Sequence, residues 1–183
     1  MATPYERAKR RKQERAFRRA HRDLDPDRIA TVDAGEHAAL AMWELMDGVA
    51  HLRVVVPIKG DNPLAIVQAL KAYRPEKVII EEPYFLRNSG FQSLRSYLLR
   101  RDHWTTICNL MGIEEEEVHP ATWMPTVPGW EKGAGDANKE TYRRHASDFV
   151  GRHLTQDEGA AVCIGLWYWR NERGIALRFP GEG

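Results

Sequence analysis

Two short apolar runs that each end in a carboxylate constrain this chain more than any other feature. Residues 28–33 read Arg-Ile-Ala-Thr-Val-Asp, and residues 77–81 read Lys-Val-Ile-Ile-Glu. Runs of this length and composition are typical of buried strands, so Asp33 and Glu81 are expected where two strands end. An acid behind a strand is most often simply solvated, but rigidly held carboxylates are also what Mg²⁺ binds together with phosphate oxygens. The combination favours metal-dependent phosphoryl chemistry.

The first half of the chain predicts a mixed β-sheet. The apolar patterns indicate strands at 28–33, 37–44, 52–57 and 78–81, with a helix at 62–73. Gly35 and the pair Asp47-Gly48 are turn signals that suit antiparallel hairpins, and Asp61 is the expected cap of the helix. A helix that leads from this meander back into an apolar strand is typical of a crossover, which makes the strand at 78–81 parallel to an earlier one.

The second half of the chain predicts mainly helices. They are expected at 93–102, 138–154 and 156–170, with one short edge strand at 118–119. The last helix is apolar almost all round and has Thr155 as its expected cap. It should pack across the sheet and bring Asp157 and Glu158, in its first turn, to the strand ends. The expected fold is α/β, with a five-stranded mixed sheet flanked by helices.

The composition indicates one soluble globular domain. The 183 residues are 43% hydrophobic and 29% charged. No apolar run approaches the roughly 20 residues that a membrane-spanning helix needs, so no membrane partner is expected. Cys108 and Cys163 lack a CxxC spacing, which favours a reducing cytoplasm, and the histidines lack zinc-ligand spacing. The tryptophan-rich segments, at 123, 130 and 167–169, suit a core or a dimer interface better than base stacking.

A basic arm precedes the first predicted strand. Nine of the first 22 residues are Lys or Arg, although the net charge of the chain is only +1. Such an arm neutralises phosphates and releases counterions, so we expect it to bind nucleic acid, with Arg10 and Arg11 among its contacts. The alternative is a solvated or poorly ordered terminus. Pro26 marks the boundary, which leaves residues 1–25 as the arm.

Four short motifs stand in a familiar order. They are Ile-Ala-Thr-Val-Asp-Ala-Gly at 29–35, Val-Ile-Ile-Glu-Glu-Pro at 78–83, Gly-Ala-Gly-Asp-Ala-Asn-Lys at 133–139, and Asp-Glu-Gly-Ala-Ala at 157–161. Together they resemble the RuvC-like Holliday junction resolvases of the RNase H-like superfamily. The resemblance covers roughly residues 28–170. It implies an RNase H-like nuclease domain at 26–172, between the arm and a C-terminal tail at 173–183.

The resemblance also implies an activity. Such an enzyme is a homodimeric, Mg²⁺-dependent endonuclease that cuts four-way DNA junctions to 5′-phosphate and 3′-hydroxyl ends, with Mn²⁺ able to substitute and no small-molecule cofactor. By the same resemblance, the metal ligands are Asp33, Glu81 and Asp157, and Lys139 acts beside them on the phosphate. Branched DNA is the expected partner.

Two positions depart from the pattern or leave it open. Glu81 and Glu82 are adjacent, and adjacent strand residues point to opposite faces; Glu81 is the expected ligand. The family's last helix usually carries two acids one turn apart, whereas here Ala160 follows Asp157, and Glu158 is the substitute candidate for a second metal position. If Glu158 does not serve, the chain is a weakened nuclease or a DNA-binding protein without activity. An RNase H-like nuclease for another branched or hybrid substrate is a third interpretation.

Three further residues are candidate DNA contacts. The loop after Glu81 is rich in aromatic, basic and small polar residues, which suits entry into a junction. Arg87 and Asn88 are its candidates. Lys132, just before the Gly-rich motif, is a candidate phosphate contact together with Lys139.

Overall fold

The structure, a computed structural model, describes residues 26–35, 37–58, 62–82 and 91–178, with side chains at 91–94 and 97 left aside. Its centre is one mixed sheet with the strand order β5-β4-β1-β2-β3-β6. The strands are β1 (Arg28–Asp33), β2 (Ala39–Met46), β3 (Val49–Pro57), β4 (Lys77–Glu81), β5 (Glu114–Val118) and β6 (Ala176–Arg178). β1, β2 and β3 pair antiparallel, whereas β4 runs parallel to both β1 and β5, and β6 parallel to β3. The predicted mixed sheet is confirmed.

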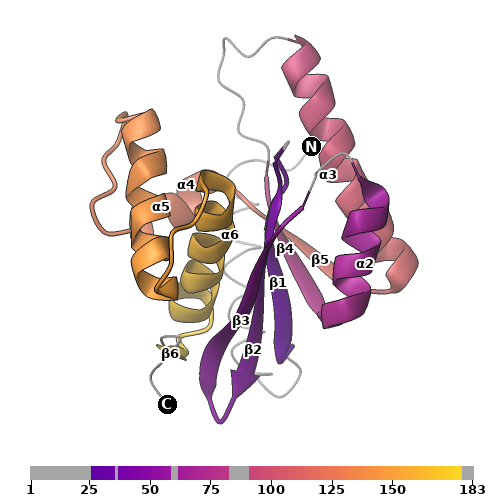
Figure 1. Ribbon diagram of the computed structural model, residues 1–183, viewed down its shortest axis with the longest axis horizontal. Helices are drawn as coiled ribbons and strands as arrows, with labels where there is room; N and C mark the ends of the chain where they lie inside the picture. The colour runs from indigo at the N-terminus through magenta and orange to yellow at the C-terminus, as the bar shows by residue number, and fades with distance from the viewer. Residues whose placement is uncertain (1–25, 36, 59–61, 83–90, 179–183) are drawn as a thin grey trace, which may run out of the picture.

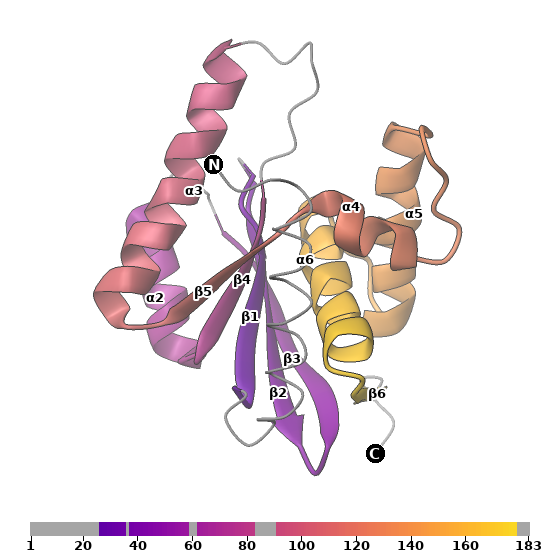
Figure 2. The same cartoon turned by 180° about the vertical axis from the view of Figure 1, so that it is seen from behind.

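Helices cover both faces of the sheet (Figures 1 and 2). On one face lie α2 (Pro63–Tyr73) and α3 (Phe91–Met111), and on the other lie α4 (Pro120–Trp123), α5 (Asp136–Val150) and α6 (Gln156–Trp167). A 3₁₀ turn, Met124–Thr126, follows α4, and a π-helical turn, Tyr168–Glu172, extends α6. Among the described residues, no helix is both long and apolar enough to cross a membrane.

The sheet differs from the prediction at its two edges. It has six strands rather than five, because Ala176–Arg178, within the predicted tail, pairs with β3; three residues are too few to produce a readable alternation. At the other edge, β5 spans the acidic run itself, Glu114–Val118, instead of 118–119. Four successive glutamates hide a strand from pattern reading, and cations hold them in place: Lys77 and Arg101 form ion pairs with them.

Helix ends also differ in part. The cap of α2 is Asn62, whose side chain accepts a hydrogen bond from the Ala65 N–H at 3.2 Å, and not Asp61, which lies outside the described residues. α3 runs on to Met111, and α5 ends at Val150, where Gly151 adopts a positive φ of 76°. The predicted cap Thr155 is confirmed, since its hydroxyl accepts from the Glu158 N–H.

Strand alternation divides the core into two. Ala30 and Val32 of β1 belong to the cluster beneath α2 and α3, whereas Ile29 belongs to the cluster beneath α5 and α6. In β4, Ile79 packs on the α6 side as well. Because successive side chains point to opposite faces, the odd-numbered residues of β1 and β4, Asp33 and Glu81 included, face α6.

Close packing fixes α6 against this face of the sheet. The Thr31 hydroxyl donates to the Ala161 carbonyl at 2.6 Å and accepts from the Trp43 indole N–H at 3.1 Å. Gly165 lies so close to Trp43 that an added Cβ would collide with the indole ring. On the other side of α6, a Cβ at Gly159 would come within 2.8 Å of the Arg143 Cα of α5. These contacts set the position of the first turn of α6.

Candidate active site

Three carboxylates from separate elements meet where two central strands, β1 and β4, end. β1 and β4 are parallel neighbours in which Ile29 pairs with Lys77 and Thr31 with Ile79, so the register places Asp33 beside Glu81. Asp157, in the first turn of α6, completes the group: its side chain is hydrogen-bonded to that of Asp33. All three side chains are partly accessible to solvent. The structure thus brings together the three acids that the sequence predicts as ligands.

Asp33 lies at the centre of this cluster. Burial, and then the negative charge of Asp157, raise the pKa of Asp33 to about 7, against a hydrogen bond that its Oδ1 accepts from the Gly35 N–H at 3.1 Å. Gly35 also makes room for the cluster, because an added Cβ there would lie 3.3 Å from the Asp33 Oδ1 and 3.9 Å from the Asp157 Oδ1. A hydrogen bond between two carboxyl groups requires a proton, so the pair shares one where Asp33 remains protonated.

Glu81 is held by a buried tryptophan. Its Oε1 accepts a hydrogen bond from the Trp123 indole N–H at 3.0 Å. Burial raises the pKa of Glu81 well above its ordinary value, and the charges of Asp33 and Asp157 raise it further, while the bond from Trp123 opposes the shift. Trp123 is fully buried and packs edge-to-face on Tyr142 of α5, with ring centroids 5.5 Å apart.

Two basic side chains adjoin the carboxylates. The positive charge of Lys139 lowers the pKa values of Asp33 and Asp157, although burial dominates and leaves both raised. Lys139 extends from the first turn of α5, where its Nζ pairs with the Asp136 Oδ1 at 3.2 Å. The second is His37, in the exposed turn before β2, whose charge also favours the ionised form of Asp157. Lys139 was predicted to act here, whereas His37 was not.

The donor chemistry of the cluster fits a divalent cation. Burial raises the pKa values of all three carboxyl groups, and neighbouring carboxylates add to the shift at Asp33 and Glu81. Carboxylate oxygens are the donors that hard cations such as Mg²⁺ prefer. Within the described part of the chain, no three His, Cys, Asp or Glu side chains are grouped closely enough to enclose an ion. The two aspartates instead bond to each other, and Glu81 bonds to Trp123. The fit therefore rests on the donors and their charge.

Glu158 makes its contacts away from the three acids, and its predicted role as a ligand stays a prediction. It is buried, and one of its oxygens accepts from the Thr155 N–H at 2.8 Å, closing a capping box at the start of α6. Its other oxygen accepts from Arg152 at 3.1 Å. Both oxygens are thus committed to the fold. Ala160 is also buried in the core, so neither position supplies an acid beside Asp157.

The remaining predicted residues have varied outcomes. Glu82 lies beyond the end of β4, where its N–H donates to the Val118 carbonyl at 2.8 Å, so Glu81 is the glutamate on the α6 face. Lys132 is exposed in the turn before α5. Arg10, Arg11, Arg87 and Asn88 lie outside the described residues, and their predicted roles stay predictions.

Sequence reasoning missed three neighbours of the carboxylates. Gly35 was read only as a turn residue, and His37 only as one scattered histidine. Trp123 was predicted in the core or a dimer interface, and it is fully buried within the chain, as are Tyr168 and Trp169. Its bond to Glu81 has no sequence signal, because the two residues are 42 positions apart. Only the pairing of β4 with β5, which places Val118 beside Glu81, brings them together.

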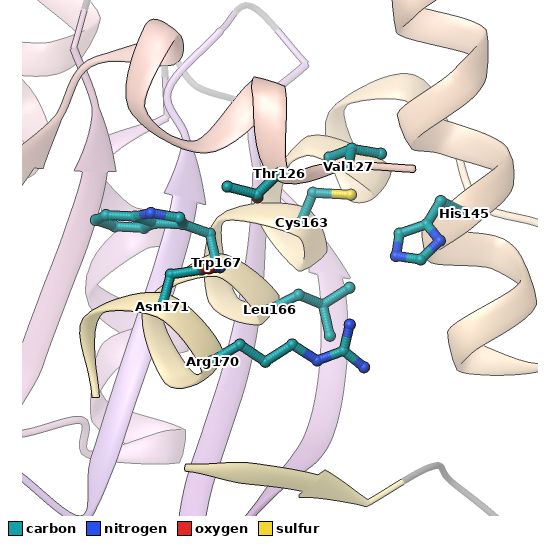
Figure 3. Close-up of a pocket in the computed structure, with 8 residues that line it drawn as sticks. All are labelled: Thr126, Val127, His145, Cys163, Leu166, Trp167, Arg170 and Asn171. Atoms are coloured by element: carbon teal, nitrogen blue, oxygen red, sulfur yellow. The ribbon is translucent and has the colours of Figure 1, made fainter. Parts of the chain in front are cut away.

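A small cavity lies apart from the carboxylates, between α5 and the C-terminal half of α6 (Figure 3). Its volume is about 20 Å³, room for roughly one water molecule. His145 of α5, Cys163 and Leu166 of α6, and Arg170 of the π-helical turn are among the residues that line it. Its size excludes a substrate site.

Comparison with known proteins identifies the fold. No family model matches the sequence, and no curated protein matches it significantly. Among solved structures, Thermus thermophilus RuvC in complex with a Holliday junction substrate is 17% identical, with a TM-score of 0.60, covering 78% of this chain and 95% of that one. The fowlpox virus resolvase in complex with substrate Holliday junction DNA is 16% identical, with a TM-score of 0.55, covering 77% and 95%. The yeast mitochondrial Holliday junction resolvase is 10% identical, with a TM-score of 0.52, covering 88% and 86%.

Proposed function

We propose that this chain, which has the fold of the RuvC-like resolvases, is a divalent-metal-dependent endonuclease that resolves four-way DNA junctions. The observation that carries the proposal is that Asp33, Glu81 and Asp157 meet where the central strands β1 and β4 end and α6 begins. Solved structures with the same fold include two bound to Holliday junction DNA. Neither the carboxylate cluster nor the fold alone would support this function as well as the two together.

Asp33, Glu81 and Asp157 would hold the metal, with Mg²⁺ as the proposed ion and Mn²⁺ as its substitute. Bound divalent cations at such sites supply an activated water and stabilise the leaving oxygen of a phosphodiester. The protein contributes position and charge. Asp33 must lose its proton to act as a ligand, and the neighbouring charge of Lys139 favours that loss. Lys139 is exposed and flexible enough to meet a phosphate oxygen beside the cluster.

The proposed partner is branched DNA, bound by a homodimer. Two equivalent active sites would account for symmetric cuts at a four-way junction, since a two-fold dimer presents the same site twice. Lys132 and Lys139 are the described candidates for phosphate contacts, and the basic arm would add a salt-dependent, sequence-independent contribution. We propose a cytoplasmic location on the basis of the two cysteines, both of which are free and buried.

A labelled, immobile four-way junction tests the activity. We expect paired cuts near the branch point, with 5′-phosphate ends, in Mg²⁺ or Mn²⁺, and none with Asp33→Asn. A linear duplex of the same sequence is the control and should remain intact. Junction cleavage that persists in Asp33→Asn would contradict the assigned site.

The structural roles of Glu158 and Ala160 favour a second candidate, a junction-binding protein with weakened or no nuclease activity. It predicts tight junction binding without cuts in either metal. A panel of junction, flap, RNA–DNA hybrid and duplex substrates also separates the resolvase from an RNase H-like nuclease of another specificity. Preferential cleavage of a flap or hybrid would replace the junction assignment.

A further inference from the structure

The bond between Trp123 and Glu81 is unusual in its chemistry. An indole N–H donates and never accepts, so it can bind only an oxygen of the Glu81 carboxyl group. The distance from Nε1 to Oε1 is 3.0 Å, and the indole ring is fully buried. One oxygen of Glu81 thereby accepts a hydrogen bond from the protein, and within the described part of the chain the other oxygen accepts none.

The contact between Trp123 and Glu81 is produced by the connection from β5 to α4, beside the end of β4. Val118, the last residue of β5, pairs with Glu81. α4 begins directly afterwards, with the His119 Nδ1 accepting from the Ala121 N–H at 3.0 Å. The single turn of α4 then delivers Trp123 back to the strand end, where Tyr142 packs on its ring at 67°. The indole is therefore held by its own packing, independently of Glu81.

We infer that Trp123 is a positioning residue that fixes the Glu81 carboxylate for binding a divalent cation. This inference rests on the proposed function of the carboxylate cluster. Glu has three side-chain torsions, and ordering a long side chain costs conformational entropy. A donor already fixed by the core reduces the cost of that ordering at the moment of binding, as groups behind metal ligands commonly do.

Titration with Mn²⁺ in the absence of DNA tests the inference, with free Mn²⁺ followed by electron paramagnetic resonance. Trp123→Phe keeps an aromatic ring and removes the N–H. We expect it to weaken Mn²⁺ binding about ten- to a hundredfold, the usual cost of losing a group that orients a ligand. Trp104→Phe is the matched control: Trp104 is equally buried, and its indole N–H has no acceptor among the described residues. We expect its Mn²⁺ affinity to stay within about twofold of the native value.

A second readout uses the native chain and does not depend on the folding of any variant. The chain has six tryptophans, whose indole N–H groups give separate signals in a ¹H–¹⁵N spectrum. Mg²⁺ should move the Trp123 signal, assigned through the backbone, more than the Trp104 signal. A residue that merely fills the core would not show this response.

The outcomes separate the inference from the proposed function. Native Mn²⁺ affinity in a folded Trp123→Phe variant, or a Trp123 signal that ignores Mg²⁺, would overturn the positioning role alone. Weakened binding in that variant, in a protein that cuts no DNA, would support the positioning role while the nuclease proposal fails. A native chain that binds neither cation would overturn both.

Discussion

The two ends of β4 carry buried charge in opposite ways. At its start, Lys77 is almost fully buried but forms ion pairs with Glu114 at 2.8 Å and Glu116 at 2.6 Å. Burial alone would lower the pKa of Lys77, yet these glutamates raise it above its ordinary value. At the end of β4, Glu81 faces the same side of the sheet, and burial raises its pKa together with its carboxylate neighbours. Balanced charge is typical of a structural contact, whereas perturbed carboxylates without a balancing charge are typical of a candidate functional site.

The largest effect is expected from removing Asp33, the central acid of the carboxylate cluster at the end of β4. We expect Asp33→Asn to lower the cleavage rate by more than about a hundredfold, because losing a group that only orients a metal ligand can already lower activity that much. Single-turnover cleavage of a four-way junction measures the loss. Junction affinity, measured in Ca²⁺ or EDTA, should change far less. Equal losses of binding and cleavage would show that Asp33 supports the fold or the DNA surface instead.

Removing Lys77, the buried lysine at the start of β4, should instead affect stability. Lys77→Met removes the buried ammonium group that pairs with Glu114 and Glu116, both of which are partly exposed to water. We expect the free energy of unfolding to fall by about 1–3 kcal/mol, less than for a fully buried pair. Denaturant unfolding measures it. Cleavage at a temperature well below the transition should stay close to native, and a selective loss of cleavage would place Lys77 in the active site.

The pH dependence of stability tests the raised pKa of Asp33. Since Asp33 keeps its proton in the folded state up to about pH 7 but loses it near pH 3.8 when unfolded, the unfolded state binds fewer protons between these values. The free energy of unfolding of the metal-free protein should therefore fall as pH rises from about 4 to 7, by roughly 2 kcal/mol or more. Asp33→Asn should reduce this fall, and Mg²⁺ should oppose it. A pH profile that the substitution leaves unchanged would contradict the raised pKa.

Adjacent acids on α6 offer the smallest test. Glu158→Gln keeps the shape of the capping box but weakens its bonds to Thr155 and Arg152, so we expect a loss of about 1 kcal/mol in stability and no change in Mn²⁺ affinity. Asp157→Asn should weaken Mn²⁺ binding and leave the stability nearly unchanged. Calorimetric unfolding and Mn²⁺ titration of the two variants provide the measurements. A weaker Mn²⁺ site in Glu158→Gln would return this residue to the ligand set.

Much of the site was predictable because its acids end well-patterned strands. β1 was predicted at its observed bounds, 28–33, and the two apolar runs placed Asp33 and Glu81 at strand ends. The first turn of α6 was predictable from Thr155. Which of its two acids faces the site was not, because the choice depends on whether Arg152 and the Thr155 N–H occupy Glu158. Trp123 and His37 were beyond reach for a similar reason: their roles come from tertiary neighbours that no local pattern records.

The acidic strand β5 has a consequence for how copies of this chain can meet. It forms an outer edge of the sheet, and open edges invite strand-to-strand association. Two copies joined through β5 would set glutamates opposite glutamates, and like charges directly across a strand pair repel. The edge thus resists both aggregation and sheet extension between subunits. Any homodimer of this protein is therefore expected to form through a surface other than the β5 edge.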